Sequence, residues 1–219
     1  MKKLMKMFGA VGLLAGMMLA SGCGDDATPG TVSKSTTVPT TSVTAGAVAG
    51  TITTTAAVPA TSAVTVGGQT LTATVTVPSG VTITPPAGST FSATAPPTIV
   101  VSQPVDGKTA GVPAVKSGGT TFSVADSAGA VDVAIAGVSS FTVSGAGVSV
   151  TIPVVTAPTV PITVAAVKAD GTTATYTGAN VTYNAAASTV TVAGVTNFCW
   201  FIVNPKKANP SGTGSVSVF

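Results

Sequence analysis

The side chains able to carry out chemistry are few in this 219-residue chain, which contains no His, Arg or Glu. Its ionisable residues are nine Lys, six Asp, two Cys and two Tyr. General acid–base catalysis near neutral pH relies mostly on His or on a tuned Glu, with Asp and Lys as the remaining candidates. Phosphate and nucleic-acid recognition favours the forked guanidinium of Arg. The sequence therefore predicts a protein that is not an enzyme and that binds neither nucleic acid nor a small-molecule substrate.

The sequence also predicts no metal and no cofactor. The six Asp are scattered and form no D-x-D-x-D run, whereas a calcium loop needs several oxygen ligands close together. Asp106-Gly107 and Asp170-Gly171 are typical of hairpin turns, because Gly accepts the positive φ that such turns require. With no His in the chain, Cys199 alone cannot assemble a transition-metal site. The glycine-rich stretches lack the spacing of a phosphate-binding loop.

Residues 1–22 have the features of an export signal. Lys2, Lys3 and Lys6 form a basic start, and an apolar stretch follows from Met7 to Ala20. This stretch is shorter than the roughly 20 apolar residues that a transmembrane helix needs. Once the signal is removed, six Lys balance six Asp, so the mature chain is near neutral. Near neutrality argues against electrostatic binding to nucleic acid or to anionic lipid.

The segment Leu19-Ala20-Ser21-Gly22-Cys23 resembles the bacterial lipobox, in which small residues precede a Cys that receives diacylglycerol before cleavage. The resemblance implies that Cys23 is lipidated and becomes the first residue of the mature protein. Several acyl chains anchor firmly, because each buried CH₂ contributes about 0.8 kcal/mol. Gly24 rather than Asp follows Cys23, which favours the outer membrane, on its periplasmic face or at the cell surface. The alternative is an ordinary secretory signal with an incidental Cys.

Residues 23–63 have the composition of a flexible linker. Thr, Ser, Ala and Pro recur without a stable period, and no aromatic residue is present. Little apolar surface is available to offset the backbone ordering cost of about 1–2 kcal/mol per residue. We expect a disordered tether that holds the folded part tens of ångströms from the membrane. The alternative is that Val43 to Ile52 adds an edge strand to the following domain.

Residues 64–205 alternate between apolar and polar positions. The run Thr70–Val77 places Leu71, Val75 and Val77 on one face and Thr on the other. Further short runs occur at Thr98–Ser102, Thr121–Ala125, Ala130–Ala136, Val148–Val154, Pro161–Lys168, Val181–Tyr183, Thr189–Ala193 and Phe198–Val203. Turn signals without helical periodicity separate them, which predicts an all-β, Ig-like antiparallel β-sandwich. Two subdomains meeting near 153–161 are the alternative, and residues 206–219 are predicted to form a tail or a final edge strand.

Part of this region resembles a ZU5-type β-sandwich module. The runs Val131–Ala136, Phe141–Ser144 and Val148–Val154 follow in the order strand, phenylalanine-bearing strand and V-x-V-x-I-P strand. The closing run, from Lys168–Thr172 to Val190–Val203, is similar to the end of such modules. In some ZU5-type domains a His-Phe-Ser step cleaves itself. The corresponding place here is Asn197-Phe198-Cys199, where the Cys199 thiol would be the nucleophile but Asn replaces His. The alternative is that Cys199 is a small buried hydrophobe without a disulfide partner.

One further group of side chains suggests a ligand site. Tyr183, Phe198, Trp200 and Phe201 would form an aromatic platform for a glycan if they were exposed; the alternative is that they alternate between core and surface. We therefore expect a lipid-anchored cell-envelope protein with a non-catalytic structural or adhesive β-sandwich. A binding module for a glycan or an envelope protein is the alternative, and a module that cleaves itself at Phe198-Cys199 is the remote one. The expected partners of the protein are the membrane, reached through the lipid, and an envelope protein or glycan.

Overall fold

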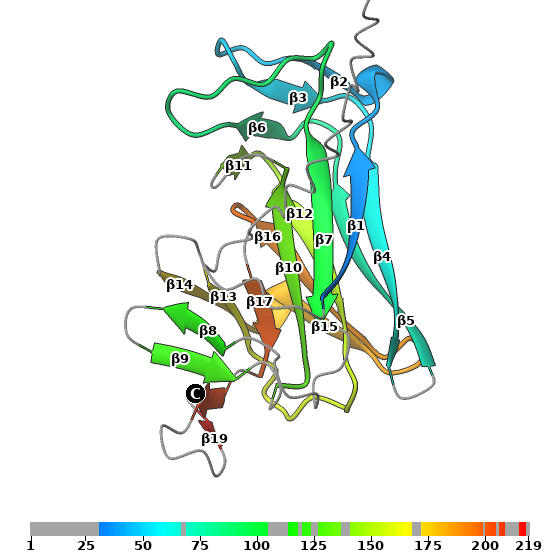
Figure 1. The fold of residues 1–219 in the computed structure, drawn as a ribbon, viewed down its shortest axis with the longest axis vertical. Coiled ribbons are helices and arrows are strands. Elements are labelled where there is room, and N and C mark those ends of the chain that lie inside the picture. Colours follow the sequence, from blue (N-terminus) through cyan, green and yellow to red (C-terminus); the bar gives the residue numbers. More distant parts are fainter. Residues whose placement is uncertain are drawn as a thin grey trace, which may run out of the picture.

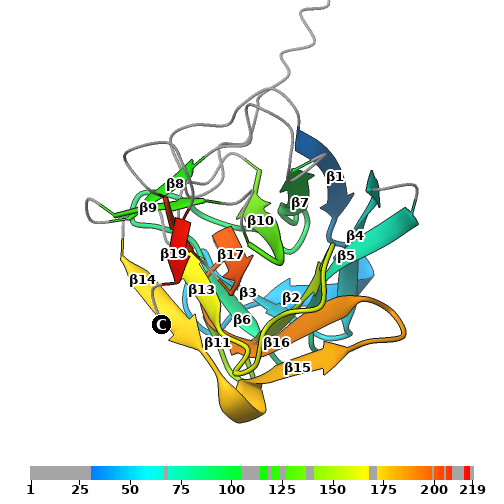
Figure 2. The ribbon, with the colours of Figure 1, turned by 90° about the horizontal axis from the view of Figure 1, so that it is seen from below.

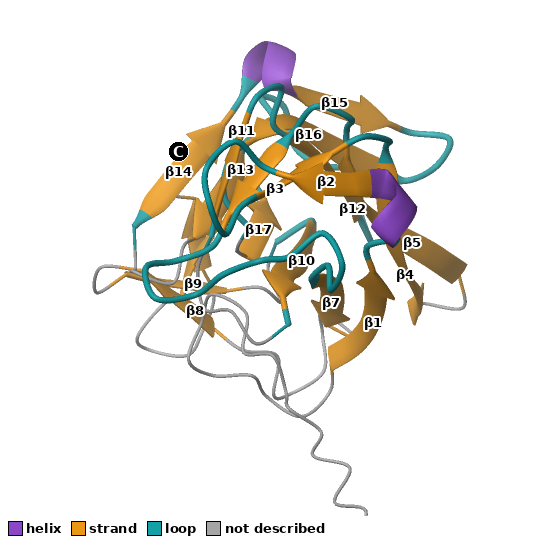
Figure 3. Ribbon diagram, turned by 90° about the horizontal axis from the view of Figure 1, so that it is seen from above, coloured by secondary structure: helices purple, strands orange, loops and turns teal. Residues whose placement is uncertain are grey.

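The computed structural model describes residues 31–66, 69–104, 114–117, 120–123, 127–136, 141–167, 172–198, 200–204, 206–208 and 215–217. These residues form antiparallel β-sheets, as expected of a chain rich in Val and Thr, whose branched Cβ atoms suit a pleated surface. Two single-turn 3-10 helices, η1 Thr40–Ser42 and η2 Gly178–Asn180, lie at the periphery (purple in Figure 3). No helix of the described residues is long and apolar enough to cross a membrane. The predicted all-β, sandwich-like antiparallel fold is confirmed.

Two large sheets face each other (Figure 1). The six-stranded sheet has the order β1 (Thr31–Thr37), β7 (Thr98–Pro104), β10 (Gly129–Ile135), β17 (Trp200–Val203), β13 (Val164–Val167) and β14 (Thr173–Tyr176). The five-stranded sheet has the order β15 (Val181–Asn184), β16 (Thr189–Val195), β12 (Val148–Pro153), β5 (Gln69–Val77) and β4 (Val58–Val66). Across the interface β10 contacts β12, and β7 contacts both β4 and β5.

Two smaller sheets complete the described part. One has the order β11 (Thr142–Ser144), β6 (Thr82–Thr84), β3 (Ile52–Thr54) and β2 (Val43–Ala45), and it lies at the upper end of the molecule in Figure 1. The other has the order β19 (Ser215–Ser217), β18 (Lys206–Ala208), β9 (Thr120–Ser123) and β8 (Ala114–Ser117). Its strands β8 and β9 lie on the side of the six-stranded sheet that faces away from the five-stranded sheet (Figure 2), and β8 contacts β13.

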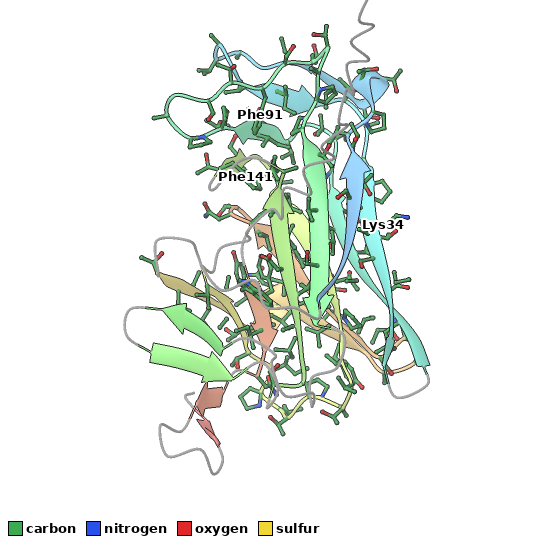
Figure 4. The ribbon with its side chains drawn as sticks, in the orientation of Figure 1. Lys34, Phe91 and Phe141 are labelled. Atoms are coloured by element: carbon green, nitrogen blue, oxygen red, sulfur yellow. The ribbon has the colours of Figure 1, made fainter. Side chains whose placement is uncertain are left out.

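A single hydrophobic cluster fills the space between the sheets. It takes Val133 from β10, Val150 from β12 and Phe201 from β17, all fully buried. The cluster continues into the upper small sheet, where Phe141 is buried and the partly buried Phe91 packs against the cluster (Figure 4). The members of this cluster come from both sides of residues 153–161. The structure therefore has one continuous core there, and not two subdomains with separate cores.

The predicted flexible linker over residues 23–63 is wrong from Thr31 onward. Residues 31–63 contain β1, β2, β3 and most of β4. Where the alternative placed one edge strand, from Val43 to Ile52, the structure has β2 at the edge of the upper small sheet and β3 beginning at Ile52. These segments have little apolar bulk of their own. They are stabilised by pairing with distant strands, β1 with β7 from Thr31↔Pro104 onward and β3 with β6. Long-range pairing of this kind leaves no mark in local composition. Residues 23–30 lie outside the described residues.

Two glycines permit close backbone approaches. A Cβ added at Gly129 would overlap the carbonyl oxygen of Pro153, where the start of β10 meets the end of β12. Gly147 has a φ of +74°, and a Cβ there would lie 2.7 Å from the carbonyl carbon of Gly194. The pairing of β12 with β16 is irregular just beyond Gly147. Positive φ and missing side-chain volume explain why glycine occupies these places.

Candidate binding surface

The predicted aromatic platform is not formed by the residues that were expected to form it. Phe198, Trp200 and Phe201 are 4%, 5% and 0% exposed, and Tyr183 is half-buried against the core. Neighbours along β17, Trp200 and Phe201 point to opposite faces of the six-stranded sheet, and Phe201 belongs to the core. The Phe198 ring meets the Phe141 ring edge to face, with centroids 4.4 Å apart. Three of the four rings therefore serve packing and cannot stack on a glycan.

The reason for this burial is the position of β17 in its sheet. β17 lies between β10 and β13, and all of its residues are buried, as are all of those in β10 and β13. Alternation of residues in the sequence shows which side chains share a face of a strand. It does not show whether both faces of that strand are covered by other parts of the protein.

The two predicted thiol sites, Cys23 and Cys199, lie outside the described residues. Phe198, on the other side of the peptide bond at which self-cleavage was considered, is held in the core. Among the residues that the structure describes, no group of three or more His, Cys, Asp or Glu could hold a metal ion.

Asp132 is a buried carboxylate on the outward side of β10. It is 6% exposed and lies opposite Ser102 of β7 and Trp200 of β17. The residue makes further interactions within the fold. Burial of a charged group is costly unless it is paired or hydrogen-bonded, so we interpret Asp132 as part of the packing of this sheet. Lys34 of β1 is exposed and extends away from the sandwich (Figure 4).

The most regular surface of the molecule is the outward face of the five-stranded sheet. One row of cross-strand partners runs through all five strands and consists entirely of threonine: Thr182, Thr191, Thr151, Thr74 and Thr61. Partners at the same level share a face, so the five hydroxyl-bearing side chains stand in line. The row spans roughly 19 Å, since neighbouring strands lie about 4.8 Å apart. We call this set the threonine row.

The threonine row is ordered and partly exposed. The Oγ1 atoms of Thr151 and Thr191 are 3.0 Å apart and share a hydrogen bond. Thr61 and Thr182, at the two ends of the row, are exposed, whereas the three inner members are half-buried by their neighbours. Directly beneath, Val75, Val150 and Val192 point into the core and are fully buried. A well-packed inner face thus supports the hydroxyl groups on the outer one.

The face around the row carries no charge. None of the five strands contains Lys, Arg, Asp or Glu, and their outward residues are mostly Thr, Ser, Asn and Ala. Hydroxyl groups donate and accept hydrogen bonds, while the threonine methyl groups supply apolar contact. The sequence showed Thr alternating with Val in several runs. Assembly of these runs into one row depends on strand order and register, which the pattern does not give.

Comparison of the chain with protein-family models, with curated proteins and with solved structures finds no match.

Proposed function

We propose that this is a lipid-anchored protein of the bacterial cell envelope, with a non-catalytic β-sandwich that acts as a structural or adhesive module. The threonine row is the observation that carries the adhesive part. An ordered row of hydroxyl and methyl groups without charge suits neutral partners, such as a glycan or an uncharged protein surface, because no ion has to be desolvated on contact. The absence of His, Arg and Glu from the whole chain supports a non-catalytic role.

The lipid anchor is supported by the sequence Leu19-Ala20-Ser21-Gly22-Cys23. Gly24 after the Cys supports outer-membrane localisation. The ZU5-type classification is also part of the proposal, and it is supported by β10, β11 and β12, which follow one another in the order that the resemblance requires.

The adhesive part is tested by photo-crosslinking in cells. A photoreactive residue is placed at Thr61 or Thr182, the exposed ends of the row, and at Thr142, which is exposed on β11 of the small sheet, as the matched control. We expect Thr61 and Thr182 to capture the same envelope component and Thr142 to capture none. A second change, Thr74→Lys, should abolish the crosslinks by placing a charge in the row. Equal capture from Thr142 would contradict an adhesive role for this face.

The anchor is tested by fractionation. Replacement Cys23→Ala should move the protein from the membrane fraction to the soluble fraction, because the acyl chains are lost. The unchanged protein, extracted only by detergent, is the control. Retention of the Cys23→Ala variant in the membrane would refute lipidation as the anchor.

A further inference from the structure

The connection between β12 and β13 exposes two of the three most exposed large hydrophobic side chains of the described residues. Val160 is 87% exposed and Val155 is 51% exposed; the third, Val48, is 67% exposed and lies between β2 and β3 at the other end of the molecule. Residues 154–163 read VVTAPTVPIT and include no charged residue. We call residues 154–163 the apolar loop.

The apolar loop is held firmly by Asn204, which follows β17. The Asn204 Nδ2 group donates to both the carbonyl oxygen and the Oγ1 of Thr159, each at 2.7 Å. Its Oδ1 accepts from the Thr163 N–H at 3.0 Å, and its own backbone N–H donates to the Thr163 carbonyl at 2.7 Å. At the other side of the loop, the Val155 N–H donates to the Ala128 carbonyl at 2.9 Å. The exposed valines are therefore displayed by a braced loop.

The apolar loop lies at the same end of the sandwich as the start of the first strand. Thr31, the first residue of β1, pairs with Pro104 at the end of β7, and β7 runs antiparallel to β10, which starts at Gly129. The apolar loop contacts the chain directly before Gly129 through the Val155–Ala128 hydrogen bond. Two strand spacings, about 10 Å, separate β1 from β10 across the sheet. In Figure 1, β1 points upward toward the end that carries β2 and β3, so its first residue lies at the end of the strand that is farther from them.

Chain length fixes how far this end can lie from the lipid. Residues 24–30, seven in number, separate Cys23 from Thr31. The eight residue-to-residue steps from Cys23 to Thr31 span at most about 29 Å when fully extended. The described fold thus begins much closer to Cys23 than a linker up to residue 63 would have placed it. If Cys23 is acylated, the end of the sandwich that carries the apolar loop is confined near the membrane surface.

We infer that the apolar loop is a second membrane contact, which inserts Val155 and Val160 into the lipid surface that holds the acylated Cys23. This inference rests on the proposed lipid anchor. Two exposed apolar side chains on an uncharged loop leave water when they enter the boundary between headgroups and acyl chains. The contact fixes the orientation of the sandwich, so that the end that carries β2 and β3 is the one far from the membrane.

The inference is tested with the acylated full-length protein in phosphatidylcholine vesicles. Tryptophan is introduced by Val160→Trp or, as the matched control, by Val48→Trp, and the acyl chains of the lipid are brominated to quench nearby tryptophan. Trp200, the one native tryptophan, is buried, and the unsubstituted protein gives its background. We expect Val160→Trp emission to shift to shorter wavelength and to fall roughly two-fold or more on brominated lipid, with Val48→Trp unchanged. Equal thermal unfolding midpoints check that both variants are folded.

The outcomes separate the loop from the anchor. Flotation of the protein with vesicles, without selective quenching at position 160, overturns the loop contact and leaves the anchor standing. Failure to float with vesicles overturns the anchor, and the loop contact falls with it. A blue shift at position 160 that depends on protein concentration and not on bromine places a second copy of the chain on the loop, and this also overturns the inference.

Discussion

The two large sheets use the same alternation of side chains but treat their outward faces differently. In the six-stranded sheet, β10, β13 and β17 are buried on both faces, so that outward residues such as Ala165 and Ile202 are 0% exposed. In β5, β12 and β16 of the five-stranded sheet the core-facing valines are equally buried, but the outward face carries the half-buried and exposed members of the threonine row. One sheet thus has two packed faces, and the other has one packed face and one surface.

This difference assigns different tasks to the two sheets. Apolar burial is the main stabilising contribution to a fold, so the six-stranded sheet, with two covered faces, should be the less tolerant of substitution. The five-stranded sheet leaves much of its outward face exposed, and this is the face at which we propose that a partner binds. The buried aromatic residues Trp200 and Phe201 belong to the first sheet, which is why they do not form a ligand platform.

The largest effect should come from shortening an outward side chain of the six-stranded sheet. Ile202→Ala removes a fully buried side chain outside the main core cluster and should lower the free energy of unfolding by about 2–5 kcal/mol. Thr182→Ala, at one exposed end of the threonine row, should change it by less than about 0.5 kcal/mol. Denaturant unfolding of both variants measures the difference. Similar small losses would mean that the outward face of the six-stranded sheet is not packed.

The next effect concerns Asn204, which joins the end of β17 to the loop that leaves β12 and so links the two sheets. Asn204 has a φ of +46°, a region that asparagine and glycine adopt more readily than alanine. Asn204→Ala loses three side-chain hydrogen bonds and adds backbone strain, for an expected loss of about 2–4 kcal/mol.

Asn204→Gly separates the two contributions. Glycine loses the same hydrogen bonds but accepts the positive φ, so its loss should be about 1 kcal/mol smaller than that of alanine. Thermal and urea unfolding of the two variants give the comparison. Equal losses would show that backbone strain at this position is negligible.

A smaller effect is expected where the five-stranded sheet continues into the upper small sheet. Thr54 is 2% exposed, and its Oγ1 donates to the carbonyl oxygens of Pro78 and Val81 and accepts from the Val81 N–H at 3.0 Å. Thr54→Val keeps the shape and leaves the buried Val81 N–H without that acceptor, at a cost of about 1–3 kcal/mol. Thr54→Ser, which keeps the hydroxyl, is the control. Equal stability of Thr54→Val and the unchanged protein would contradict this role.

Much of the strand pattern could be predicted from the sequence, because inward valines alternate with outward threonines. The runs 70–77, 130–136, 148–154 and 189–193 are found as β5, β10, β12 and β16, within one or two residues. Within residues 206–219, for which a tail or a final edge strand was predicted, the structure has β18 and β19. In these segments local side-chain periodicity and tertiary packing agree.

The features missed from the sequence all depend on distant partners. β1 has one aliphatic residue, Val32, and it forms because it pairs with β7, 61 to 73 positions later in the chain. The threonine row needs the order of five strands from three separate parts of the chain. The burial of Trp200 needs a cover over the outward face of its sheet. None of these relations has a local signature, whereas the proposed export signal and lipobox are read from short, local stretches of sequence.

The smallest effect is a gain in stability, on the inward face of the five-stranded sheet. Ser62 of β4 is 1% exposed, and its Oγ has no hydrogen-bond partner within the part of the chain that the structure describes. Removal of a buried hydroxyl without a partner relieves its desolvation cost, so Ser62→Ala should raise the free energy of unfolding by about 1 kcal/mol. The urea midpoint should rise at constant slope, whereas Ser79→Ala, in an exposed turn, should leave the midpoint unchanged. A loss of stability in Ser62→Ala would show that the hydroxyl has a hydrogen-bond partner. The inward face of the five-stranded sheet would then be as well packed as that of the six-stranded sheet.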